Sequence, residues 1–194
     1  MLCSLFLPAW YVAAVNFHPE MIPARLAWSI SEAKLNVPFS TLFEVLIMLL
    51  AFEAVQEAGL RLPGPIGQTA SILGGLVVGS AAVEAAIVSP VVLIVVAIAG
   101  IAGYTVPSQE FSAALRIWRF LLVIGASLGG LFAVTALTAV LVGRLAQLES
   151  FGVPYLAPFA PGQGKDGYGV LRWPTHRVKF REAILHTRNR RRQG

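Results

Sequence analysis

Three long stretches of this chain carry no charged residue, and they restrict its fold more than any other feature. They cover residues 62–83, 85–109 and 120–143, which are 22, 25 and 24 residues long. A helix needs about 20 apolar residues to cross the hydrocarbon core of a bilayer. Residues 120–143 would rise about 36 Å as one helix, so this stretch predicts a transmembrane helix.

The composition also indicates a membrane protein. Hydrophobic residues make up 56% of the chain and charged residues only 13%, whereas a soluble domain carries about 25% charged residues. We therefore predict an all-α, polytopic integral membrane protein. About four to five helices are expected to be embedded in the membrane, some of them short or broken.

Positive charge is concentrated at the end of the chain. Residues 162–194 hold nine Lys or Arg against two acids, which puts this tail at +7 and the first 161 residues at −2. The positive-inside rule places such a tail in the cytoplasm. Lipid headgroups explain the basic residues more simply than a nucleic acid, so we expect lipids as partners and no nucleic acid. The predicted organisation is a membrane domain, residues 1–161, and a basic cytoplasmic tail, residues 162–194.

Prolines and capping residues divide the membrane domain into helices. Pro19, Pro23 and Pro38 interrupt residues 17–39 and leave room only for a short helix, which has the mixed composition of a helix on the membrane surface. Ser40 is a suitable N-cap for the next helix, and Pro90 suits the first turn of a later one. The expected helices cover about residues 1–17, 24–35 (interfacial), 41–58, 66–88, 90–104 and 111–148.

Small residues recur at four-residue intervals in the helix expected at 66–88. They would form a narrow stripe that lets another backbone approach closely, as at helix contacts in lipid. A carboxylate near its end would be rejected by hydrocarbon unless it faced protein or water. These features fit the wall of a pore or a seam between subunits; the alternative is an ordinary packing helix whose acid lies at headgroup level. The candidate residues are Ser71, Gly75, Val78, Gly79, Ser80 and Glu84.

The helix expected at 41–58 carries three acids. Glu53 and Glu57 are four residues apart and share a face, whereas Glu44 lies about 180° away around the helix. We expect these acids to be buried or interfacial near the ends of the helix.

Three arginines flank the last apolar stretch. Arg116 and Arg119 precede it, and Arg144 follows it. They either anchor the helix at lipid headgroups or act as structural bases, for example by pairing with Glu110.

No residue pattern indicates catalysis or metal binding. Cys3 is the single cysteine, and His18, His176 and His186 lie far apart in the sequence, so no cysteine or histidine cluster is available as a metal site. We therefore expect a protein that is not an enzyme and has neither a cofactor nor a metal.

Several segments together resemble the A subunit of GerA-type spore germination receptors, in the order and spacing of that family. They are 17–23 (FHPEMIP), 37–39 (VPF), 52–53 (FE), 57–63 (EAGLRLP), 66–67 (IG), 74–78 (GGLVV), 81–85 (AAVEA), 88–90 (VSP), 115–116 (LR), 119–120 (RF), and 150–156 (SFGVPYL) with Pro158.

The resemblance implies a subunit of a nutrient-responsive receptor in the spore inner membrane, beside a transporter-like B subunit and a lipoprotein C subunit. It further implies a homo-oligomer that forms the ion-conducting part and triggers germination. Because the family's N-terminal soluble domain is absent, we expect the C-terminal membrane portion of a longer protein or a truncated reading frame. The alternative function is a non-conducting scaffold or assembly subunit of the receptor. A secondary transporter is a weaker alternative because the sequence has no inverted repeat.

Overall fold

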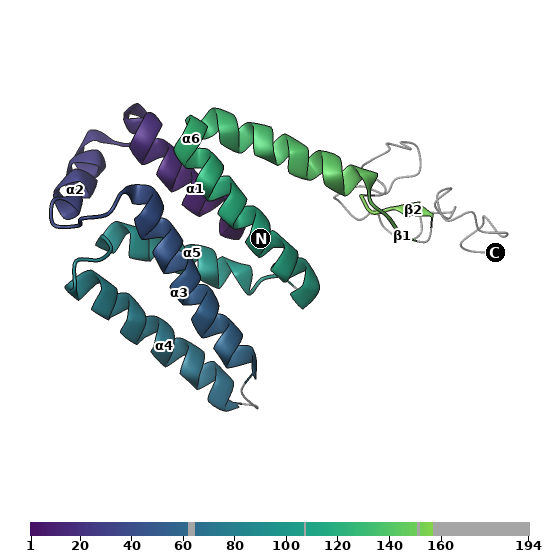
Figure 1. Cartoon of the computed structure of the whole chain (residues 1–194), viewed down its shortest axis with the longest axis horizontal. Helices are drawn as coiled ribbons and strands as arrows, with labels where there is room; N and C mark the ends of the chain where they lie inside the picture. Colours follow the sequence, from purple (N-terminus) through teal and green to yellow (C-terminus); the bar gives the residue numbers. More distant parts are fainter. Residues whose placement is uncertain (62–64, 107, 151, 157–194) are drawn as a thin grey trace, which may run out of the picture. The chain divides into compact units, whose positions relative to one another are not determined.

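A computed structural model describes residues 1–61, 65–106, 108–150 and 152–156 of the chain. This part is mostly helical, as predicted (Figure 1). Its elements are α1 (Leu2–Phe17), a 3-10 turn (Pro19–Met21), α2 (Ala24–Lys34), α3 (Thr41–Arg61), α4 (Pro65–Glu84), α5 (Pro90–Gly103), α6 (Gln109–Gln147), β1 (Glu149–Ser150) and β2 (Val153–Pro154). The predicted basic tail, residues 162–194, lies outside the described residues.

The chain forms two compact units, Met1–Thr138 and Ala139–Gly194. The first unit contains α1 to α5 and most of α6. The described part of the second unit contains the end of α6 and a small antiparallel pairing of β1 with β2, in which Ser150 lies opposite Val153. Gly152 in the intervening turn has a positive φ of 76°, a conformation that glycine adopts without steric cost.

Helices α1 and α5 pack against each other in the core of the first unit, to which α3 and α6 also contribute fully buried residues such as Met48 and Leu122. Ala9, Val12 and Ala13 of α1 are fully buried, as are Val92 and Ala99 of α5. Small and β-branched side chains let the two helices approach closely. The central core therefore joins two helices that are far apart in the sequence.

Helices α3 and α4 follow each other in the chain and pack side by side (Figure 1). Helix α3 continues through Gly59 to Arg61, three residues beyond the predicted boundary at 58. Helix α4 ends at Glu84, four residues before the predicted boundary at 88. The early end has a local cause, because Ala86 adopts a left-handed conformation with φ 51° that cannot continue the helix.

Helix α6 is sharply bent, although the sequence predicted one continuous helix over residues 111–148. Gly129 has φ −142° and ψ 21°, and Gly130 has φ 57° and ψ −145°; both are outside the helical region. Adjacent glycines make this bend possible because they lack the Cβ that would clash in such conformations. The bend divides α6 into two arms, residues 109–128 and 131–147.

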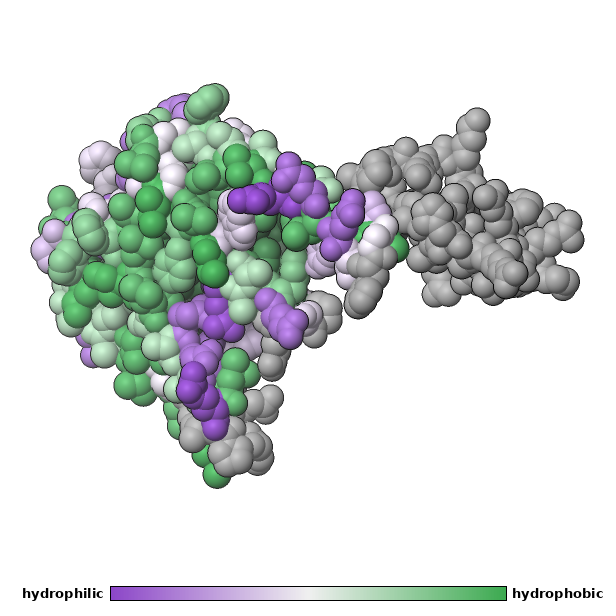
Figure 2. Space-filling view, turned by 45° about the vertical axis from the view of Figure 1, so that its right-hand side comes forward, coloured by the Kyte–Doolittle hydropathy of each residue, from purple (hydrophilic) through white to green (hydrophobic). Residues whose placement is uncertain are grey.

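One helix in the described part, Glu110–Gln147, is long and apolar enough to cross a membrane, by length and composition alone. Three shorter apolar helical stretches are Leu2–Phe17, Leu73–Glu84 and Pro90–Gly103. The face drawn in Figure 2 is mostly apolar, with hydrophilic residues gathered in a few patches. The predicted number of four to five embedded helices stays a prediction.

Candidate functional site

The small-residue stripe of α4 faces other helices of the same chain. The Ser71 hydroxyl donates a hydrogen bond to the Val55 carbonyl of α3 at 3.3 Å. A Cβ added to Gly75 would lie 3.7 Å from the Phe52 ring of α3, and one added to Gly79 would lie 2.9 Å from Leu93 Cδ1 of α5. Within one chain the stripe is thus a packing surface.

The outer face of α4 has a different character. Leu73, Leu76 and Val77 are each more than half exposed. Ser80 and Glu84 are also exposed, and they lie one helical turn apart on this outer side. Val78 is half-buried between the two faces. Of the predicted pore or packing residues, Ser80 and Glu84 are therefore the exposed pair.

No contact in the described part of the chain gives Glu84 a stabilising role. It is the last residue of α4, where the negative end of the helix dipole disfavours a carboxylate by about 0.3–1 kcal/mol. No ion pair to it occurs among the described residues. An exposed acid in an unfavourable place is a better candidate for function than for packing.

The turn that follows Glu84 is held by backbone hydrogen bonds. The Ile87 amide donates to the Ala82 carbonyl at 2.9 Å, and the Ala86 amide donates to the Val83 carbonyl at 3.0 Å. This pair of bonds is the Schellman motif, whose left-handed position is usually glycine. Here Ala86 occupies that position, which strains the backbone by about 1–2 kcal/mol.

A buried carboxylate fixes the far end of this turn. Glu44 of α3 is completely buried, and its Oε2 accepts a hydrogen bond from the Ser89 amide at 2.9 Å. Its Oε1 lies 3.5 Å from Lys34 Nζ at the end of α2, and Lys34 also donates to the Thr41 hydroxyl. The Tyr11 hydroxyl of α1 and Ser89 Oγ are buried beside this carboxylate.

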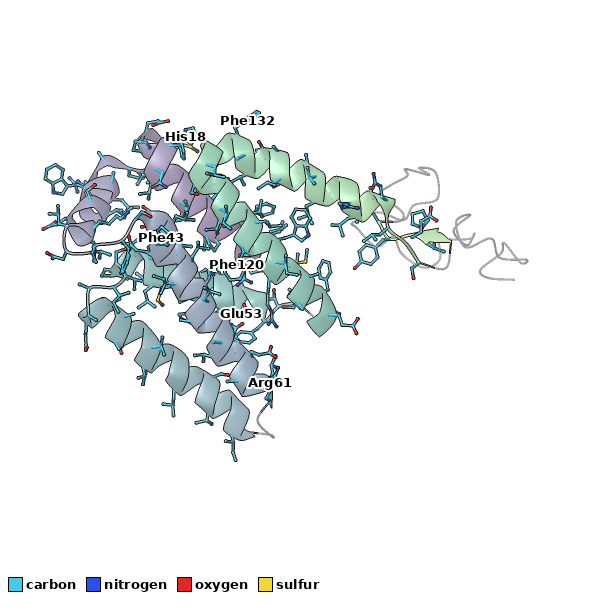
Figure 3. All side chains as sticks on the ribbon, in the orientation of Figure 1. His18, Phe43, Glu53, Arg61, Phe120 and Phe132 are labelled. Carbon is cyan, nitrogen blue, oxygen red and sulfur yellow. The ribbon has the colours of Figure 1, made fainter. Side chains whose placement is uncertain are left out.

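The other two acids of α3, Glu53 and Glu57, form ion pairs with an arginine of α6. Arg116 forms ion pairs with Glu53 and, at 3.5 Å, with Glu57 Oε2; Arg61 pairs with Glu57 at 3.0 Å. Figure 3 shows Glu53 and Arg61 along α3, with Arg61 at the end of the helix. Arg116 therefore has Glu53 and Glu57 as partners in place of the Glu110 that the sequence suggested.

The remaining two predicted bases have different environments. Arg119 is only 7% exposed, and a Cβ added to Gly103 at the end of α5 would lie 3.7 Å from its Nη2. Its Nε has no hydrogen-bond partner in the part of the chain that the structure describes. Arg119 is thus enclosed by protein, which differs from the headgroup contact considered for it, whereas Arg144 is exposed in the second unit.

Sequence reasoning missed Lys34, Ala86 and Ser89. Lys34 ends α2, seven residues before Thr41 at the start of α3, and Ser89 is 45 residues after Glu44. These residues belong to different elements, so no helical periodicity relates them. The described residues contain no group of three or more His, Cys, Asp or Glu that could hold a metal ion.

Comparison with known proteins gives consistent matches. The family described as Bacillus/Clostridium GerA spore germination protein matches residues 1–189. Uncharacterized membrane protein YfkQ of Bacillus subtilis is 45% identical over 89% of this chain, and spore germination protein B1 of the same organism is 42% identical over 93%. Spore germination protein GerLA of Bacillus cereus is 40% identical over 96% of this chain.

These relatives are longer proteins. The matched region covers 34% of YfkQ and 38% of each of the other two, so the chain spans about a third of their length. No solved structure matches the chain.

Proposed function

This chain belongs to the GerA family of spore germination proteins, and from that premise we propose that it is a membrane subunit of a nutrient-responsive germination receptor that forms an ion-conducting pore with further copies of itself. The receptor lies in the spore inner membrane, with the basic tail of this subunit in the cytoplasm. Its other partners are membrane lipids, a transporter-like B subunit and a lipoprotein C subunit. The protein works without catalysis, cofactor or metal.

The exposed outer face of α4 carries the pore proposal. In an oligomer arranged around an axis, this face would bring Ser80 and Glu84 of each copy to the wall. A ring of carboxylates favours cations over anions. The unfavourable position of Glu84 at the end of its helix supports a functional role for this acid.

The small residues behind this face have a supporting role. Ser71, Gly75 and Gly79 pack α4 on α3 and α5 of its own chain, so they hold the wall helix in place. A pore therefore depends on the outer face of α4, while the stripe determines how firmly that face is supported.

Potassium efflux from liposomes that contain this chain tests the proposal. We expect efflux, and we expect Glu84→Gln to reduce cation selectivity because it removes the charge of the ring. Glu110→Gln is the matched control, because Glu110 is also an exposed acid but lies on α6. Equal selectivity of the two variants would refute the assignment of Glu84.

A scaffold subunit is the second candidate function. The observation that favours it is the exposed apolar outer face of α4, where Leu73, Leu76 and Val77 are each more than half exposed and suit contact with a partner subunit. Intact oligomers in crosslinking without any potassium efflux would support the scaffold and refute the pore. On this alternative, Glu84→Gln would weaken association with a partner subunit.

A further inference from the structure

The carboxylate of Glu44 links three separate elements. It belongs to the first turn of α3, and its two oxygens contact Lys34 of α2 and the amide of Ser89 at the start of α5, at 3.5 Å and 2.9 Å. Glu44 and Ser89 are both completely buried. One buried charge thus connects the end of α2 with the start of α5.

The two contacts of Glu44 depend on each other. A carboxylate without water is tolerated only when ion pairs and hydrogen bonds compensate its charge. Within the described residues Lys34 is the one cation within ion-pair distance of Glu44, and the Ser89 amide adds the positive end of the α5 dipole. If Lys34 moves away, Glu44 loses the cation that compensates its charge and must follow it. This movement weakens the bond to Ser89.

Helix α2 is suited to move. Leu26 and Trp28 are 49% and 76% exposed, Leu35 directly after the helix is 82% exposed, and Ile30 is the one buried apolar side chain of α2. An element with few buried contacts opens at a low free-energy cost. Its ion pair through Lys34, together with the buried Ile30, holds it to the rest of the first unit.

The turn between α4 and α5, at the Ser89 end of the linkage, is strained. Ser89 ends the turn that begins after Glu84, and Ala86 in this turn holds a strained left-handed conformation. Loss of the bond from the Ser89 amide to Glu44 would allow this strain to relax. The residues between Glu84 and Ser89 would then move.

We propose that Lys34, Glu44 and Ser89 form a latch through which the position of α2 controls the α4–α5 turn that follows Glu84. The consequence for ion flow rests on the proposed pore function. The linkage itself is a property of the fold, and it can be measured without any flux.

Hydrogen–deuterium exchange of the full chain in lipid nanodiscs tests the latch. We expect Lys34→Met to speed exchange of the Ser89 amide by about 10- to 100-fold, because a hydrogen bond to a charged group loses that much protection. Arg25→Met is the matched control, since it removes an exposed cation from the same helix. Faster exchange in α2 alone, with Ser89 unchanged, would overturn the proposal.

A charge-reversed pair separates the ion pair from the amide contact. Lys34→Glu combined with Glu44→Lys restores opposite charges, but the new lysine cannot accept a hydrogen bond from Ser89. We expect α2 to be protected as in the wild type and the Ser89 amide to exchange rapidly. Wild-type protection of Ser89 in this double variant would also overturn the latch.

Two further measurements keep the outcomes distinct. If Lys34→Met unfolds the chain, fast exchange will extend to the α1–α5 core. Lys34→Gln then replaces it, because it removes the cation but keeps a polar side chain beside Glu44, and the same faster exchange of the Ser89 amide is expected. Potassium efflux is recorded on the same variants. Absence of efflux from every variant would refute the pore. The latch is tested separately, by whether the Ser89 amide exchanges faster in these variants.

Discussion

Gly130→Ala should destabilise the protein strongly because two independent costs fall on one methyl group. Gly130 has φ 57° and ψ −145°, and holding a residue with a Cβ in such a region costs about 1–3 kcal/mol. The added Cβ would also lie 3.0 Å from Phe17 Cβ and 3.1 Å from His18 Nε2, and such overpacking costs about 1–3 kcal/mol. Figure 3 shows His18 near the bend of α6. The expected loss is therefore about 2–6 kcal/mol.

Thermal unfolding in detergent, followed by circular dichroism, measures this loss. A destabilisation of that size lowers Tm by roughly 4–24 °C in a chain of this length. Gly143→Ala is the matched control, because a Cβ at Gly143 meets nothing within 4 Å, and alanine favours the helix by about 0.5–1 kcal/mol. If both variants unfold at the same temperature, residue 130 is helical and the reasoning about the bend is wrong.

Disulfide formation tests the same bend by distance. A Cβ added to Gly125 would contact the Leu137 side chain of the second arm, whereas in a straight helix the two positions are about 18 Å apart. Gly125→Cys with Leu137→Cys, in a Cys3→Ser background, should crosslink rapidly. Ser127→Cys with Leu137→Cys is the control, because position 127 lies on the opposite side of the first arm. No crosslink in either pair would indicate a straight α6.

Two other substitutions probe the turn after Glu84 and the ion pairs of α3. Ala86→Gly should raise stability by about 1 kcal/mol, seen as a higher Tm, because glycine relieves the left-handed strain; an unchanged or lower Tm would mean that the turn is relaxed with alanine. Arg116→Gln should cost about 1–3 kcal/mol because it leaves Glu53, 19% exposed, without its cation. The exposed Arg144→Gln serves as its control in the same Tm assay, and equal values would argue against a stabilising Arg116–Glu53 pair.

The sequence predicted the faces of α3 well. A spacing of nine residues indicated that Glu44 and Glu53 point in opposite directions, and the structure places Glu44 beside Lys34 and Glu53 beside Arg116. Helical periodicity is sufficient for this inference, because it depends only on residues within one helix. The identity of the partners was not predictable, since it depends on how separate helices meet.

For the glycines, the sequence left open which helix each of them contacts. Small residues four apart, such as Gly75 and Gly79, indicate close packing of helices in lipid, and this spacing is the same whether the neighbour is another chain or the same one. In the structure Gly125 faces Leu137 beyond the bend, and Gly79 faces Leu93 of α5. The early end of α4 was missed because Ala86 occupies a position where glycine would have been the recognisable signal.

The contact between α1 and α5 has a consequence for biosynthesis. Residues 18–89, which are 72 residues, separate the end of α1 from the start of α5, and a ribosome translates them in about 4–14 s at 5–20 residues per second. During that interval Ala9, Val12 and Ala13 lack the neighbours that bury them in the finished protein. The α3–α4 hairpin needs only local contacts and is free to assemble first. Helix α1 is therefore synthesised before its neighbours but is among the last to be enclosed by them.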